Sequence, residues 1–273
     1  MVRNTLSKGW DMTRRHKYVL VVLFLYRLLW GFFLYRFIDS FVSPVLSRYP
    51  DNHPNSDAVQ LFLIEAQFRL LKTDISDEVL WMLAGMFLIR MLLTPLLNAG
   101  LFYSFRHSDE SQGTRVLAGM RRAWKPVTAL YWLENAAALL PAAWLVPLAR
   151  ARFSAEPSLP DWALGLLPYA LGWIAWSFAV HLLFQFMQFS AAAGHSIPGG
   201  LLRACRRALP LLAVTLTIIG VGFAASLVVT TASLLWTGFA AVVLHQAFQL
   251  VRSLVSLWTA ASQFELWKPE SAA

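Results

Sequence analysis

The stretch PLLAVTLTIIGVGFAASLVVTTASLL, from Pro210 to Leu235, decides the fold because it contains no charged residue. A helix of roughly 20 mostly apolar residues is enough to cross a bilayer core of about 30 Å. The whole chain shares this bias: 58% of its 273 residues are hydrophobic, 14% are charged, and the mean hydropathy is +0.53. Soluble domains average nearer half apolar and a quarter charged. The composition excludes a disordered chain, a fibrous protein and a soluble enzyme, and it predicts an all-α polytopic membrane protein.

Five other stretches have the length and apolar content of a membrane span. Working outward from the quoted stretch, these predicted spans are Phe239–Ser262, Trp162–Ser190, Pro126–Leu148, Val79–Tyr103 and Tyr18–Val42. Only Trp236-Thr237-Gly238 separates the last two spans of the chain, so we expect them to form a tight hairpin. The pattern predicts one six-helix transmembrane domain over residues 1–273.

The distribution of basic residues predicts the orientation of the spans. With the N-terminus inside, the inner segments hold 14 of the 23 Lys and Arg residues and the outer segments hold 5. Cytoplasmic segments of membrane proteins carry this excess. We therefore expect a bacterial cytoplasmic (inner) membrane protein with both termini in the cytoplasm. The formal charge of +8 is then explained by contact with membrane lipids of the anionic inner leaflet, and no nucleic-acid partner is expected.

The segment 43–78 is the one long outer loop in this threading. Within it, residues 58–71 place apolar side chains such as Leu61, Ile64 and Phe68 at three- and four-residue steps, which predicts a helix. We expect this helix to lie on the outer membrane surface. The alternative is a plug that packs across the mouth of the helix bundle.

Three basic segments precede membrane spans and resemble one another: residues 8–17, 115–125 and 201–209. Arg-Arg-Ala occurs in the second and the third, and each of these two leads to a proline at the start of a span, Pro126 or Pro210. The pattern indicates three repeats of a basic interfacial helix followed by a transmembrane hairpin. The alternative is that the positive-inside bias alone places arginines before every inward-starting hairpin.

The stretches 113–122 and 199–207 each place glycine before a basic amphipathic helix that leads back into the membrane. In this respect the chain resembles the six-helix membrane domain fused to some bacterial glycerophosphodiester phosphodiesterases, and the stand-alone relatives of that domain. The resemblance implies the six-helix architecture over most of the chain. It does not imply phosphodiesterase activity, because the catalytic domain has no room in this chain.

Motifs for chemistry are largely missing from the sequence. A single cysteine, Cys205, excludes an internal disulfide and a multi-cysteine metal site, and neither a phosphate-binding loop nor an H-E-x-x-H zinc motif occurs. The segment from Gly194 to Pro198 resembles half of a nucleophile elbow, but proline stands where the G-x-S-x-G pattern needs glycine. We therefore expect no enzyme activity and no cofactor.

Ionisable residues inside spans are costly and usually face protein or water, so they are the candidate ligand-binding residues. Five of them have comparable predicted depth: Arg27, Arg90, Glu134, His181 and Arg252. Glu134 is the one acid of this layer, and we expect it to pair with Arg27, Arg90 or Arg252. The layer suits an anionic or lipid-headgroup ligand. The alternative is a structural pairing that fixes the register of the helices.

Other polar and small residues also recur at helical spacing. His181, Gln185 and Gln188 do so on the fourth span, and His245 and Gln249 on the sixth, which favours helix–helix hydrogen bonds over a polar path or a two-histidine metal site. Two pairs of small residues on the fifth span predict close helix packing: Gly220 with Ala224, and Gly222 with Ser226. Tryptophans near predicted span ends indicate an interfacial aromatic belt: Trp10, Trp30, Trp81, Trp124, Trp162, Trp236 and Trp267.

Together these features favour a non-enzymatic integral membrane protein that acts as a scaffold, assembly partner or accessory factor, with another membrane protein as a possible partner. The alternative function is that of a small transporter or lipid-handling protein that uses the buried charged layer. Discontinuous helices typical of transporters are suggested only by Pro95, Pro141 and Pro168.

Overall fold

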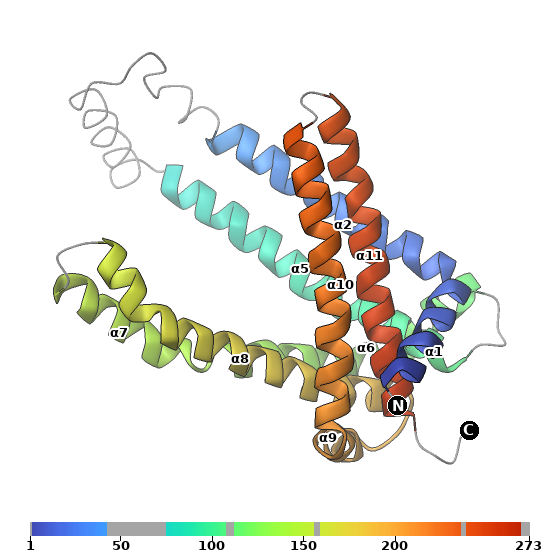
Figure 1. The fold of residues 1–273 in the computed structure, drawn as a ribbon. Helices are drawn as coiled ribbons and strands as arrows, with labels where there is room; N and C mark the ends of the chain where they lie inside the picture. Colours follow the sequence, from blue (N-terminus) through green and yellow to red (C-terminus); the bar gives the residue numbers. More distant parts are fainter. Residues whose placement is uncertain (1, 43–74, 108–111, 156–158, 236–238, 269–273) are drawn as a thin grey trace. The chain divides into compact units, whose positions relative to one another are not determined.

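The computed structural model describes residues 2–42, 75–107, 112–155, 159–235 and 239–268. Apart from short turns these are helical, with no β-strand among them (Figure 1). The all-α prediction is therefore confirmed for this part of the chain. The predicted surface helix at 58–71 lies outside the described residues. The elements are α1 (Val2–Arg15), α2 (Lys17–Phe37), a π-helical turn (Ile38–Val42), α5 (Ile75–Arg106), α6 (Gln112–Leu139), α7 (Ala142–Ala155), α8 (Leu159–Ala192), α9 (Ile197–Arg206), α10 (Ala208–Leu235) and α11 (Phe239–Trp267).

Five segments are long and apolar enough to cross a membrane. They are Lys17–Ser40, Val79–Arg106, Thr114–Arg152, Trp162–Ala192 and Ala208–Ser233. Large apolar side chains on these segments are exposed, Trp81 and Leu209 most of all. Such a surface is stable against lipid and unfavourable against water. The protein is therefore a membrane protein by the composition and exposure of its helices.

The third span was predicted as one continuous helix over 126–148, and this is wrong. The helix begins well before it, at Gln112, so the basic segment 115–125 is the first part of α6 and not a separate helix. The helix then ends at Leu139, and α7 begins only at Ala142. Pro141 explains the break, since proline has no backbone N–H and its ring clashes with the preceding turn of a helix.

The contacts divide the chain into two units. One unit is Val21–Leu93, which contains most of α2 and the first part of α5. The other, here called the main unit, is Met1–Leu20 together with Thr94–Ala273.

The core of the main unit is a set of aromatic rings contributed by three helices. The ring of Phe264 on α11 lies 5.4 Å from that of Phe105 on α5 and 5.5 Å from that of Phe189 on α8. Trp267 lies 5.2 Å from Phe264 and is 1% exposed, so its prediction as a belt residue is wrong. The reason is that α11 continues past the predicted end of its span, at Ser262, and carries Trp267 into the core.

Glycines let helices of the main unit approach one another closely. A Cβ on Gly9 of α1 would lie 2.1 Å from Ser262 Oγ of α11, and one on Gly200 of α9 would lie 2.7 Å from the carbonyl oxygen of Phe186 on α8. The small-residue pairs of α10 differ from each other. A Cβ on Gly222 would lie 3.1 Å from Val255 of α11, whereas no atom would lie within 4 Å of one on Gly220, so close packing at Gly220 is wrong.

We expect Gly9→Ala to destabilise the main unit by about 1–3 kcal/mol, because the added methyl overlaps both the side chain and the backbone of Ser262. Thermal unfolding of the detergent-solubilised protein measures this. Gly220→Ala is the matched control, and it should be neutral or stabilising by up to about 1 kcal/mol, since it adds helix propensity without a clash. Equal effects of the two changes would contradict the tight α1–α11 contact.

Candidate functional site

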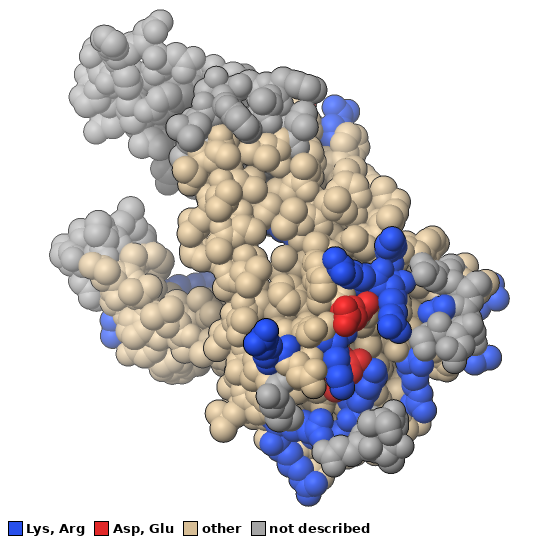
Figure 2. Space-filling model, turned by 45° about the vertical axis from the view of Figure 1, so that its right-hand side comes forward, with Lys and Arg blue, Asp and Glu red and all other residues tan. Residues whose placement is uncertain are grey.

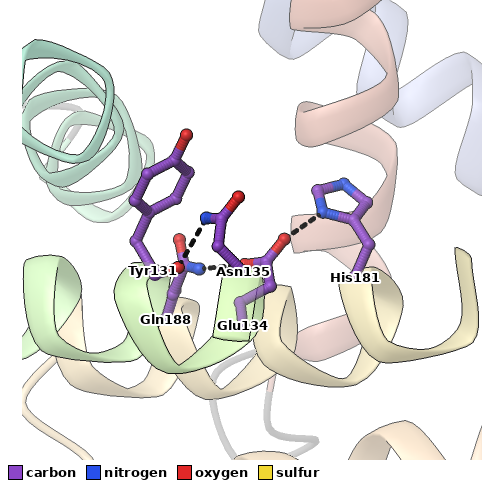
Figure 3. Close-up of polar contacts among 5 residues, drawn as sticks. All are labelled: Tyr131, Glu134, Asn135, His181 and Gln188. Atoms are coloured by element: carbon purple, nitrogen blue, oxygen red, sulfur yellow. Dashed lines mark hydrogen bonds and ion pairs between the residues drawn. The ribbon is translucent and has the colours of Figure 1, made fainter. Parts of the chain in front are cut away.

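A buried carboxylate joins α6 to α8 (Figure 3). Glu134 of α6 points at α8, where its Oε1 lies 2.6 Å from His181 Nδ1 and its Oε2 accepts a hydrogen bond of 2.7 Å from Gln188 Nε2. His181 and Gln188 are seven residues, or about two helical turns, apart and therefore share one face of α8. Both oxygens of the carboxylate are bonded, and both bonds cross the helix interface.

The two helices are also joined beyond this contact. The indole N–H groups of Trp173 and Trp176, on α8, donate to the carbonyl oxygens of Ala138 and Ala137 at 2.7 and 2.9 Å. The last carbonyl groups of a helix have no partner within the helix. α6 ends at Leu139, and the Ala137 carbonyl also accepts a hydrogen bond of 3.3 Å from the backbone N–H of Leu140. The two tryptophans therefore bond the last turn of α6 to α8 and support the register that brings His181 and Gln188 to Glu134.

The partners that the structure gives Glu134 are His181 and Gln188. Its pairing with an arginine stays a prediction. Arg252 is exposed, and its guanidinium lies 5.1 Å from the ring of Phe248 on its own helix. Arg27 and Arg90 belong to the unit Val21–Leu93. A layer that unites all five residues as a ligand site stays a prediction.

Helix–helix hydrogen bonds were predicted for three polar residues of α8, and they are confirmed for His181 and Gln188. Gln185, the third, is buried, but its Oε1 has no hydrogen-bond partner. On α11, the side chain of His245 lies outside the described residues. Among the residues that are described, no three His, Cys, Asp or Glu side chains come together as a metal site.

The two side chains of the Glu134–His181 contact differ in their exposure to solvent. The side chain of His181 is 55% exposed and that of Glu134 is 10% exposed. The contact is an ion pair when the imidazole is protonated and a hydrogen bond when it is neutral. Chemically, the arrangement can fasten two helices through a carboxylate, each of whose oxygens bonds with α8.

We expect Glu134→Leu and Gln188→Leu each to lower the stability of the protein, and the double change to cost less than the sum of the two. The coupling should be about 0.6–1.7 kcal/mol, the range measured for hydrogen bonds between membrane helices. Thermal unfolding in detergent measures all four species. Gln185→Leu is the matched control, expected to be neutral or stabilising because its amide oxygen has no partner to lose. Strict additivity of Glu134→Leu and Gln188→Leu would contradict the contact.

A second group of polar residues lies where α8 turns into α9. Arg106 Nη1, from the end of α5, lies 2.9 Å from His195 Nε2 and also donates to the carbonyl oxygen of Ala193. The ring of His195 lies 5.7 Å from that of Trp267, and the guanidinium of Arg203 lies 5.3 Å from the same indole. Burial, with Arg106 and Arg203 close by, lowers the pKa of His195 from its ordinary value of 6.5. The imidazole is thus held neutral between two arginines.

Sequence reasoning missed this group. His195 lies in a stretch that was compared only with a hydrolase motif. Arg106 was counted only for orientation, Arg203 was considered only as part of a basic segment, and Trp267 was assigned to the aromatic belt. No spacing joins these four residues, because they lie on separate segments that the fold brings together.

The lowered pKa of His195 predicts a pH dependence of stability. Between the folded pKa and 6.5 the unfolded chain binds more protons than the folded chain, so stability falls as the pH drops through this window. We expect the wild-type protein to lose stability relative to His195→Gln as the pH falls below 6.5, and the difference to be constant above it. Unfolding curves of both proteins between pH 5 and 8, roughly the span in which histidine titrates, measure this, and curves that stay parallel would contradict it.

Comparison of the chain with known families, curated proteins and solved structures finds no match. The resemblance to the phosphodiesterase membrane domain therefore stays a prediction.

Proposed function

We propose that the chain is a six-span protein of a bacterial cytoplasmic membrane with both termini in the cytoplasm. The sixth span would be α11, which has 29 residues and packs beside α10, as in a hairpin (Figure 1). The inner ends would be those where the arginines of α1, α6 and α9 lie, in agreement with the excess of Lys and Arg that cytoplasmic segments carry.

Three similar helix ends support the proposed repeat. Phe105, Phe189 and Phe264 meet in the aromatic core, and each follows a buried polar residue on its own helix: Ser104, Gln188 and Gln263. On each of these helix ends a glycine of a basic segment packs closely: Gly119 on α5, Gly200 on α8 and Gly9 on α11. The contact of α1 with α11 joins the first repeat to the last, as a closed pseudo-threefold arrangement requires.

The native Cys205 tests the orientation, because it is the single cysteine of the chain and is exposed on α9. We expect a membrane-impermeant maleimide to label it in inverted membrane vesicles and not in intact spheroplasts. In a Cys205→Ser background, Lys268→Cys should behave in the same way if α11 spans the membrane. Labelling at residue 268 from outside the cell would contradict the sixth span.

Within this architecture we propose a non-enzymatic role as a scaffold or accessory factor for another membrane protein. The observation that supports it is the use of Glu134, whose two oxygens are both taken up by bonds between α6 and α8. A transporter that loaded a substrate or a proton onto this carboxylate would change one of these bonds during its cycle. The proposed role needs only a rigid helix pair.

Proteoliposomes separate this role from transport. We expect the purified chain to produce no flux of phosphate and no transbilayer movement of fluorescent anionic lipid above that of protein-free vesicles. Flux that Glu134→Gln abolishes, while a protein of unchanged thermal stability is recovered, would contradict the scaffold role and support the transporter.

A second candidate, lipid handling, is favoured by the surface. Figure 2 shows most of the Lys and Arg side chains of this face gathered in one region, with few acidic side chains among them, and scattered basic side chains elsewhere on the tan surface. Each basic residue near an anionic membrane surface contributes about 1 kcal/mol of attraction.

A further inference from the structure

The turn between α8 and α9 brings two arginines close to one histidine. Arg106 and Arg203 both lie close enough to His195 to lower its pKa. Within the described residues, neither arginine forms an ion pair with a carboxylate. Two cations placed around a neutral imidazole repel each other unless an anion joins them.

The start of α9 adds to this positive field. Ser196 is the N-cap of α9, but its side chain makes no capping hydrogen bond. Because Pro198 has no backbone N–H, the donors of the first turn that this side chain leaves uncapped are those of Ile197 and Gly199. The positive end of a helix dipole favours an anion at this place. Arg203 folds back toward it, since Nη2 would lie 4.0 Å from a Cβ on Gly199.

One nitrogen of this group is a buried donor without a hydrogen-bond partner. Nη1 of Arg203 is buried and has no hydrogen-bond partner. Trp267 holds the face of the guanidinium at 5.3 Å, so the side chain is fixed by stacking while this donor stays unused. A buried donor without a partner is costly, and an acceptor bound there would remove the cost.

We propose that Arg106, Arg203 and the uncapped start of α9 form a binding site for a phosphate group. Arginine guanidinium groups recognise phosphate by paired, charge-assisted hydrogen bonds. His195 would hold the Arg106 guanidinium in place through its Nε2 without adding a third charge. Arg106 is exposed, so the site is open to an anion from outside the helix bundle.

Two sources of phosphate fit the site: the headgroup of a phosphomonoester lipid and free inorganic phosphate. The lipid source rests on the proposed placement of α9 at the cytoplasmic membrane surface, and the free anion does not. Labelling of Cys205 tests that placement independently, so failure of the site and failure of the orientation are distinguishable.

The test is calorimetric binding to the purified full chain in detergent, with short-chain phosphatidic acid, short-chain phosphatidylcholine and sodium phosphate as separate probes. Phosphatidic acid should bind, and phosphatidylcholine should bind at least about tenfold more weakly. Each of Arg106→Gln and Arg203→Gln should weaken phosphatidic acid binding about tenfold, the usual size of one charge-assisted contact. Binding of sodium phosphate with the same dependence on both arginines would identify free phosphate as a ligand, and lipid binding without it would identify the headgroup.

Arg206→Gln is the matched control, because it removes an exposed arginine of the same helix. It should weaken binding less than about threefold, as a change in surface charge alone does. Arg106→Gln changes an exposed side chain and therefore gives a folded variant on which the comparison can be made. The proposal is overturned if wild-type protein binds neither phosphate probe, if Arg106→Gln binds like the wild type, or if Arg206→Gln loses as much affinity as the site variants.

Discussion

The carboxylate of Glu134 is the constraint on which the α6–α8 pair depends, because a buried carboxylate must find its hydrogen bonds within the protein. Two side chains of α8 supply them, one to each oxygen. Membrane helices gain little by exchanging lipid for one another, so polar bonds and close contacts decide which helices associate. A single carboxylate with both oxygens hydrogen-bonded can therefore fix both the helix with which α6 packs and the register of that packing.

The rest of the main unit uses close packing for the same purpose. Gly9 and Gly200 bring α1 and α9 against α11 and α8 at distances that no larger residue permits. The rings of Phe105, Phe189 and Phe264 then fill the space where three helix ends meet. Basic helices held in this way form a rigid surface, and the arginines near His195 owe their positions to it.

The composition of the sequence was sufficient to predict an all-α membrane protein, because crossing a bilayer demands long apolar helices. The depth of a residue in the membrane could also be estimated from its position along a predicted span, and this estimate gave Glu134 and His181 comparable depths. The side of the helix on which each residue lies could be matched to no partner, since a uniformly apolar span has no polar face that distinguishes lipid from protein. For that reason the bonds of Glu134 to His181 and Gln188 were not predicted. The end of α11 escaped prediction because a buried Trp267 and an interfacial tryptophan look alike in sequence.

We infer that the role of Glu134 is to join two helices and not to bind a ligand. A high-resolution structure of the full chain in lipid nanodiscs tests it most directly. We expect density for both Glu134 oxygens, one within hydrogen-bonding distance of His181 Nδ1 and the other of Gln188 Nε2. Glu134 turned away from α8, toward a water-filled cavity or a bound molecule, would contradict it.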